Sequence, residues 1–181
     1  IKGSLDSDNL VYGRNEIRVG KSLVNKSDIQ SEGNITVSED TINTGRILSD
    51  KELNIKGNTV NQGTLYGKDN IRIEKNLNNT GSVQTTGELR AKDTVNTGKL
   101  TAEGNVSTDN LDNNGEIITN KKLATKNLEN KGTGKITTGE GIDTAGNAVN
   151  HGQINTNGSF IIFSNLENYN VINVGGLVST K

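Results

Sequence analysis

The chain of 181 residues contains no cysteine and no proline, is 29% hydrophobic and carries a formal net charge of −1 at pH 7. The lack of cysteine excludes a disulfide framework and a thiolate metal site. The near-neutral charge excludes a strongly basic surface for nucleic acid or an anionic membrane, and no apolar stretch is long enough for a transmembrane segment.

Two features of the composition favour an all-β chain. Average usage would supply about nine prolines in a chain of this length, and a fold whose backbone N–H groups mostly donate to a neighbouring strand tolerates proline poorly. The low hydrophobic content alone would indicate disorder. However, the few apolar residues are regularly spaced, and this regularity favours a folded repeat.

A short phrase, Asn-x-Gly-x-apolar, recurs along the chain, beginning with a degenerate copy near Ser7. Subtracting successive asparagine positions from Asn25 to Asn168 gives steps of 18, 18, 18, 17, 17, 17, 20 and 18 residues. Such spacing indicates one structural unit repeated about ten times. The asparagines that begin the copies are Asn25, Asn43, Asn61, Asn79, Asn96, Asn113, Asn130, Asn150 and Asn168.

The unit of residues 61–78 shows the strand pattern. Apolar or small residues alternate with other types over residues 65–67 and 71–73, and Leu77 follows the polar triplet 74–76. Period-two alternation interrupted by polar triplets is typical of short strands separated by turns. Because Gly or Asn interrupts every few residues, helix is excluded. Each unit is therefore expected to hold three short strands.

Aligned units place like residues above one another in five inward-facing columns. Stacking at the interstrand spacing of about 4.8 Å would give a rod about 48 Å long. The sequence therefore predicts an all-β parallel β-helix, or solenoid, of about ten coils of 17–20 residues. The fifth inward column is expected to contain Leu23, Leu77, Val95, Leu111, Leu128 and Leu166.

The repeated asparagine has a structural explanation. Stacked amides at one corner of each coil can both donate and accept, so they can form a hydrogen-bonded ladder that also satisfies turn backbone groups. The glycine two residues later is expected to adopt a positive φ. A second corner repeats the pattern more loosely with Asn58, Asn76, Asn110, Asn127, Asn147 and Asn165.

Two segments depart from the pattern. The twenty-residue coil that begins at Asn130 is expected to bulge at residues 131–135. Residues 159–181 form an atypical, more apolar end, where alternation directs Ile161 and Phe163 outward. This pair is a candidate partner patch, although a loop or a following domain could equally cover it. We expect residues 1–181 to be a single β-helix segment excised from a longer repeat protein.

The repeated Asn-x-Gly-x-Ile phrase, with alternating strands and without Pro or Cys, resembles the haemagglutinin repeats of filamentous haemagglutinin-type exoproteins from about Ser7 to Lys181. The resemblance implies a right-handed parallel β-helix on the bacterial surface, exported through an outer-membrane two-partner secretion transporter. It further implies a receptor or glycan of unspecified identity on a host or neighbouring cell. This family includes contact-dependent inhibition proteins.

The polar residues suggest no catalytic, metal or cofactor site. Glu32 and Asp50 are expected to be neighbours in a mixed charge column with Arg14 and Lys68, which favours a solvated surface over a catalytic pair. The single histidine, His151, is expected in an exposed turn without enough ligands for a metal.

Two tyrosines, Tyr12 and Tyr66, share an outward position three coils apart. Exposed tyrosine can contact sugar, but surface strand residues are the favoured interpretation.

The sequence favours a non-enzymatic structural rod of a secreted or cell-surface bacterial filamentous adhesin. One alternative is the stalk of a contact-dependent growth inhibition effector. A carbohydrate-active β-helix enzyme is a more remote alternative, because such enzymes need converging carboxylates on one lateral face.

Overall fold

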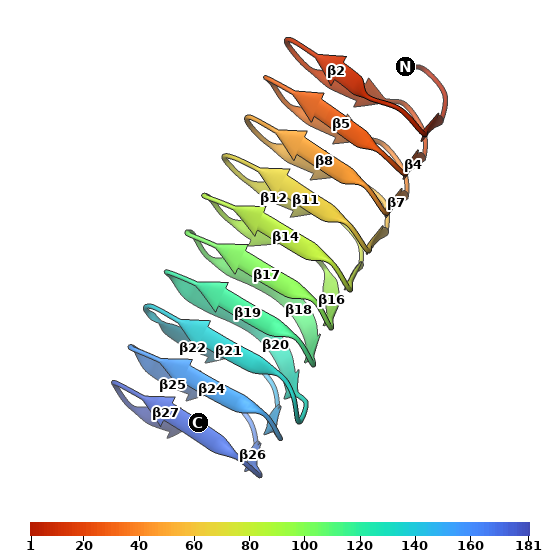
Figure 1. Cartoon of the computed structure of the whole chain (residues 1–181). Coiled ribbons are helices and arrows are strands. Elements are labelled where there is room, and N and C mark those ends of the chain that lie inside the picture. The colour runs from red at the N-terminus through yellow and green to blue at the C-terminus, as the bar shows by residue number, and fades with distance from the viewer.

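A computed structural model describes all residues 1–181 as an elongated stack of coils that contains strands and no helix (Figure 1). Its 28 strands pair only in parallel, each with the equivalent strands of neighbouring coils. Each complete coil contributes to three faces. The structure thereby confirms the predicted all-β parallel solenoid of about ten coils.

The first face is a separate sheet of ten strands. Its register places Ile29 beside Ile47 and Ile47 beside Leu65, so aliphatic side chains stack on one another inside the rod. The strands are β2 (Val11–Gly13), β5 (Asp28–Ser31), β8 (Arg46–Ser49), β11 (Thr64–Gly67), β14 (Ser82–Thr85), β17 (Lys99–Ala102), β19 (Glu116–Thr119), β21 (Lys135–Thr138), β24 (Gln153–Thr156) and β27 (Val171–Val174).

The second face carries the next two inward columns. Its strands are β3 (Ile17–Val19), β6 (Ile35–Val37), β9 (Leu53–Ile55), β12 (Ile71–Ile73), β15 (Leu89–Arg90), β18 (Val106–Asn113), β20 (Lys122–Asn130), β22 (Gly141–Thr144), β25 (Ser159–Ile162) and β28 (Val178–Thr180). Phe160 stacks in register on Ile142. The atypical end, residues 159–181, therefore continues the same stack.

The third face leads into the asparagine corner. Its strands are β1 (Leu5–Ser7), β4 (Leu23–Asn25), β7 (Thr41–Asn43), β10 (Thr59–Asn61), β13 (Leu77–Asn79), β16 (Asp93–Asn96), β23 (Ala148–Asn150) and β26 (Leu166–Asn168). The carboxyl-terminal halves of β18 and β20 complete it. These two long strands join the second and third faces into one sheet of 18 strands.

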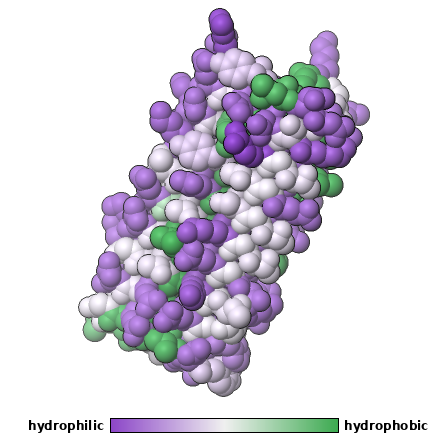
Figure 2. Space-filling model, viewed as in Figure 1, coloured by the Kyte–Doolittle hydropathy of each residue, from purple (hydrophilic) through white to green (hydrophobic).

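The interior is narrow and contains no charged side chain. A single cluster of 29 buried hydrophobic residues runs along the rod, and every buried polar residue is Asn, Ser or Thr. Figure 2 shows a surface that is mostly polar or neutral, with apolar residues in small separate groups. Since no buried group titrates near neutral pH, the core is neutral throughout that range.

At the first corner, between the third and first faces, the nine repeated asparagines form a continuous amide ladder. Each Nδ2 donates to the Oδ1 of the asparagine in the next coil at 2.8 Å, in eight steps from Asn25 to Asn168. The Asn61 Nδ2 also donates to the backbone carbonyls of Gly63 and Ser82. The eight asparagines before Asn168 are completely buried, so loss of one amide would leave buried carbonyls without a donor.

The corner glycines are needed for close approach between coils. Gly141 is the only residue with a positive φ, at 149°, so the expectation of a positive φ after each ladder asparagine was wrong. A Cβ on Gly63 would lie 2.0 Å from the carbonyl oxygen of Gly45. That oxygen accepts hydrogen bonds from the Asn43 side chain and from the backbone N–H of Thr64. Glycine thus lets successive corners reach hydrogen-bonding distance.

Thr94, not Val95, faces the core in the coil that contains β16. The register pairs Thr94 with Leu77 and with Leu111, and Val95 is 43% exposed. The assignment of Val95 to the fifth inward column was therefore wrong. In this strand register, the inward-facing residue is the one two positions before the ladder asparagine. The Thr94 hydroxyl is satisfied there by the Thr108 hydroxyl at 3.1 Å.

The twenty-residue coil absorbs its extra residues in a turn at the first corner. The backbone N–H of Gly134 donates to the carbonyl of Lys131 at 2.8 Å. The Thr133 hydroxyl donates to the carbonyl of Asn114 at 2.8 Å. The amide of Asn130 still reaches Asn150, so the expected bulge leaves the amide ladder continuous.

We predict that Asn61→Ala lowers the free energy of unfolding by about 1–3 kcal/mol, because buried corner carbonyls lose their donor. Thermal or denaturant unfolding followed by circular dichroism measures the effect. The matched control is Asn58→Ala, three residues earlier, whose side chain is exposed and whose loss should change stability by less than about 0.5 kcal/mol. Equal stability of the two variants would contradict the structural role of the amide ladder.

We also predict that Gly63→Ala destabilises the chain by about 1–3 kcal/mol or more, since the added methyl group meets fixed backbone. Gly132→Ala provides the control, because no heavy atom lies within 4 Å of the Cβ it would introduce. Unfolding midpoints of the two variants give the comparison. If Gly63→Ala were as stable as Gly132→Ala, the corners could not approach as closely as described.

Candidate functional site

The second corner, between the second and third faces, is shortened in three successive coils. In the preceding coil three residues, 74–76, separate Ile73 from Leu77, whereas the next three coils have only the pairs 92–93, 109–110 and 126–127. In two of these coils the chain passes the corner as one uninterrupted strand, β18 or β20. The expectation of three separated strands in every coil was wrong there, because one missing residue removes the turn.

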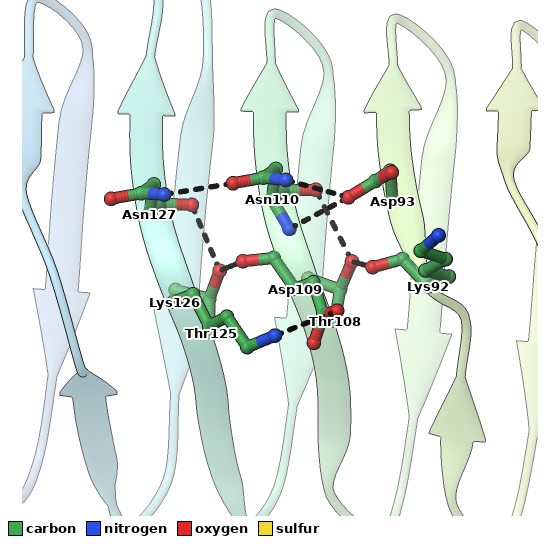
Figure 3. Close-up of polar contacts among 8 residues, drawn as sticks. All are labelled: Lys92, Asp93, Thr108, Asp109, Asn110, Thr125, Lys126 and Asn127. Atoms are coloured by element: carbon green, nitrogen blue, oxygen red, sulfur yellow. Dashed lines mark hydrogen bonds and ion pairs between the residues drawn. The ribbon is translucent and has the colours of Figure 1, made fainter.

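Two threonine hydroxyls stabilise the shortened corner (Figure 3). The Thr108 hydroxyl is shared between the carbonyls of Lys92 at 3.0 Å and Asn110 at 3.2 Å. The Thr125 hydroxyl is likewise shared between the carbonyls of Asp109 at 2.9 Å and residue 127 at 2.8 Å. At both positions threonine occupies the column that holds Val or Ile in the earlier coils, and its hydroxyl reaches the corner carbonyls.

A partly exposed row of polar side chains borders the same corner (Figure 3). The Oδ1 of Asp93 accepts from the side chain of Asn110 at 2.7 Å and from its backbone N–H at 3.2 Å. The Oδ1 of Asn110 accepts from the Nδ2 of Asn127 at 2.8 Å. At this second corner, too, polar side chains of successive coils are therefore joined by hydrogen bonds.

A surface trough lies over the shortened corners. Its main part has a volume of about 450 Å³ and shares Arg90, Ala91 and Asp109 with an adjoining hollow of about 350 Å³ toward the amino-terminal coils. The floor consists of Ala91, Thr108 and Thr125. The outward residues of the second face form one wall: Arg72, Arg90, Ser107, Ala124 and Asp143. The first residues of the second corner form the other wall, Glu74, Lys92, Asp109, Lys126 and Ala145, and Phe163 lies at the far end. Five coil steps separate its ends, a length of about 24 Å.

The floor of the trough is buried, but its small side chains are slightly more exposed than other residues of the same inward column. Ala91, Thr108 and Thr125 are 6–7% exposed, whereas Ile55 and Ile73 in the same inward column are 0% and 2% exposed. The missing corner residue therefore opens a recess into the wall of the rod.

Charges in the trough are unevenly paired. Lys126 contacts Asp109 at 3.0 Å, and Asp143 contacts Lys122 at 2.9 Å. The hydrogen bond to Asp143 raises the pKa of Lys122. In contrast, neither Arg90 nor Lys92 forms an ion pair within 4.0 Å. The amino-terminal part of the trough thus holds two cations without an ion-pair partner, Arg90 and Lys92, and one such carboxylate, Glu74, so its unpaired charge is net positive.

Arg72 extends this positive region. It pairs in register with Arg90 on the next coil, and its Nη1 lies 3.6 Å from the Oε1 of Glu52. The pKa of Glu52 is lowered, first by hydrogen bonds from Asn70 and Asn54 and then by the Arg72 charge. One carboxylate can offset the charge of only one of the two arginines, so the pair remains net positive.

The structure places the two residues of the candidate partner patch differently. Phe163 is 51% exposed and lines the end of the trough, with the Lys181 ammonium 4.9 Å from its ring centroid. Ile161 is only partly exposed and stacks in register beside Asp143. Alternation predicted that both side chains point outward. It did not predict that Phe163 borders a trough, because the trough is formed by the shortened corners of other coils.

A first surface group outside the trough involves Tyr12, Glu32 and Asp50. The Tyr12 hydroxyl donates to Glu32, and this bond, with the negative charges of Glu32 and Asp50, raises the pKa of Tyr12. Tyr66, at the same outward position three coils later, is partly exposed.

A second group pairs the only histidine with an aromatic ring. His151 stacks on Tyr169 with ring centroids 4.5 Å apart and an interplanar angle of 2°. The Tyr169 hydroxyl donates to Glu167 at 2.9 Å, which raises the pKa of Tyr169. The sequence analysis missed this pair, although each residue directly follows a ladder asparagine and the coil spacing would have revealed it.

A second hollow, of about 340 Å³, lies on the third face beyond the same corner. Its lining includes Val95 and Val149 together with Asp112 and Glu129, which are neighbours in register. Lys131 contacts Asp112 at 2.5 Å, and this hydrogen bond raises the pKa of Lys131. Of the three acidic residues in the lining, Asp93, Asp112 and Glu129, only Asp112 forms an ion pair.

Comparison with known proteins identifies no relative: the chain matches no protein-family model, no curated protein and no solved structure. The structure contains no helix that is long and apolar enough to cross a membrane. The functional conclusion therefore depends on the repeat pattern and on the geometry of the rod and its trough.

Proposed function

We propose that this chain is a structural, non-enzymatic segment of the rod of a secreted or cell-surface bacterial filamentous adhesin. The observation that carries the proposal is the uninterrupted amide ladder from Asn25 to Asn168. It joins successive coils by the same corner contacts along the stack. Such a chain adds length by repetition and contacts only its neighbouring coils.

The role of the rod is display. Stacked coils hold a distal binding region away from the cell surface, and the sequential addition of coils would also assist folding during export. The resemblance of the Asn-x-Gly-x-Ile phrase to haemagglutinin repeats supports export of the parent protein through an outer-membrane two-partner secretion transporter. It also supports a receptor or glycan on a host or neighbouring cell as the target.

The acidic residues of the trough support a binding or structural role over hydrolysis. Asp109 and Asp143 lie on opposite walls, two coils or about 10 Å apart along the axis, and each forms an ion pair with a lysine. Glycoside hydrolysis requires two carboxyl groups that converge on one bond, usually with one pKa raised. Here each carboxylate is instead bound by the ammonium group of a lysine.

We predict that antibodies raised against this chain label intact bacteria that express the parent gene. Labelling that is equally strong before and after permeabilisation supports surface display, and an antibody to a cytoplasmic protein provides the control for leakage. Labelling seen only after permeabilisation would overturn the proposed location, whereas the rod architecture would still stand.

The rod role can be tested separately by removing one whole coil. Deletion of residues 44–61 joins Asn43 to Gln62 and keeps the repeat in phase, so the shortened chain should keep its β circular-dichroism spectrum and cooperative unfolding. Deletion of residues 44–52 removes half a coil and is the matched control. If the two deletions had the same effect on folding, the coils would not be interchangeable units.

A further inference from the structure

We propose that the trough binds an acidic oligosaccharide that lies along the axis of the rod. Its anionic groups contact Arg90 and Lys92, and Phe163 provides an apolar contact at the far end. This inference goes beyond the proposed function, because a displaying rod need not bind anything along its side. Failure of the trough to bind would leave the rod proposal unchanged.

The lateral face offers side chains and no free strand edge. Strands β12, β15, β18, β20, β22 and β25 each pair in parallel with the next strand along the axis. Their backbone groups are therefore already used between coils. A peptide added as an extra strand needs an exposed edge, so a ligand in the trough must be recognised by side chains.

The amino-terminal part of the trough favours an anion. Arg90 and Lys92 lie on either side of Ala91 and lack an ion-pair partner within 4.0 Å. Arg90 also lies in register with Arg72, and like charges opposite each other on neighbouring strands repel. A bound carboxylate or sulfate would relieve this repulsion, and a planar guanidinium can bind such a group through two hydrogen bonds.

The remainder of the trough suits hydroxyl-rich rings. Ala91, Ala124 and Ala145 keep it open, while the carboxylates of Asp109 and Asp143 can accept hydrogen bonds from sugar hydroxyls. Phe163 offers an exposed apolar ring at the closed end. A length of about 24 Å accommodates several linked rings in an extended conformation.

Other polyanions fit the trough less well. Single-stranded nucleic acid is usually held by several aromatic side chains along a basic groove, whereas this trough has one aromatic ring and three acidic residues, Glu74, Asp109 and Asp143. An acidic peptide would need pockets for alternate side chains, and the open floor of Ala91, Thr108 and Thr125 provides none. Both ligands nevertheless serve as competitors in the test.

The test is isothermal titration of the intact chain with two acidic probes, hexagalacturonate and sulfated maltohexaose, and with neutral maltohexaose. Hexaglutamate and a thymidine hexanucleotide are the non-sugar polyanions. We expect an acidic hexasaccharide to bind, and the neutral sugar, the peptide and the nucleotide to bind about tenfold more weakly or not at all.

Variants then locate the site. Arg90→Ala combined with Lys92→Ala should weaken binding about tenfold or more, and Phe163→Ala about three- to tenfold. The control, Arg18→Ala combined with Lys21→Ala, removes one arginine and one lysine from the same side of the rod, on an amino-terminal coil that contributes no residue to the trough. All these residues are exposed, so unfolding midpoints should confirm that each variant is folded.

Three results would overturn the proposal. One is the failure of both acidic hexasaccharides to bind at millimolar concentration. Another is an equal loss of affinity in the trough variant and the control variant, which would indicate diffuse charge attraction. The third is binding of hexaglutamate or the nucleotide as tight as that of the acidic sugars, which would identify a general polyanion surface.

Discussion

The fold depends on the requirement that one carboxamide in each coil meets the equivalent carboxamide of the next coil at 2.8 Å. A buried amide satisfies both its donor and its acceptor only if neighbouring coils present the same group at the same height. This requirement explains why the corner glycines leave no room for a Cβ. The buried polar groups of the first corner satisfy one another, so they can occupy part of the interior in place of apolar residues. The core therefore needs few apolar residues.

The same constraint determines where the coils can vary in length. The amide ladder tolerates a two-residue insertion only as a turn that leaves Asn130 in contact with Asn150, and the missing residues fall at the second corner instead. Since three successive coils share that deletion, the shortened corners lie above one another and form a trough. Thus the loss of one residue in three successive repeats produces a charged recess on an otherwise uniform side of the rod.

Much of the fold follows from the sequence because the period of the repeat aligns residues that must stack. The asparagine spacing predicts which amides can meet, and most aliphatic residues were assigned to the core correctly. Val95 was not, because hydrophobicity favoured it although the strand register selects Thr94. The conformation of the corner glycines was also not predictable. Close approach between coils and a positive φ both require glycine, so the residue type alone does not distinguish them. The trough was not predicted, because it forms only where the missing turn straightens the backbone of β18 and β20 at the second corner. The sequence of a single coil does not reveal this change.

The most direct test of the central claim is hydrogen exchange of the asparagine side-chain amides, measured by nuclear magnetic resonance. The eight donors from Asn25 to Asn150 should each retain a slowly exchanging Nδ2 proton, because that proton is buried and bonded to the next coil. Exposed Asn76 should exchange at the rate of a free amide. Exchange of the ladder asparagines as fast as that of Asn76 would contradict the account.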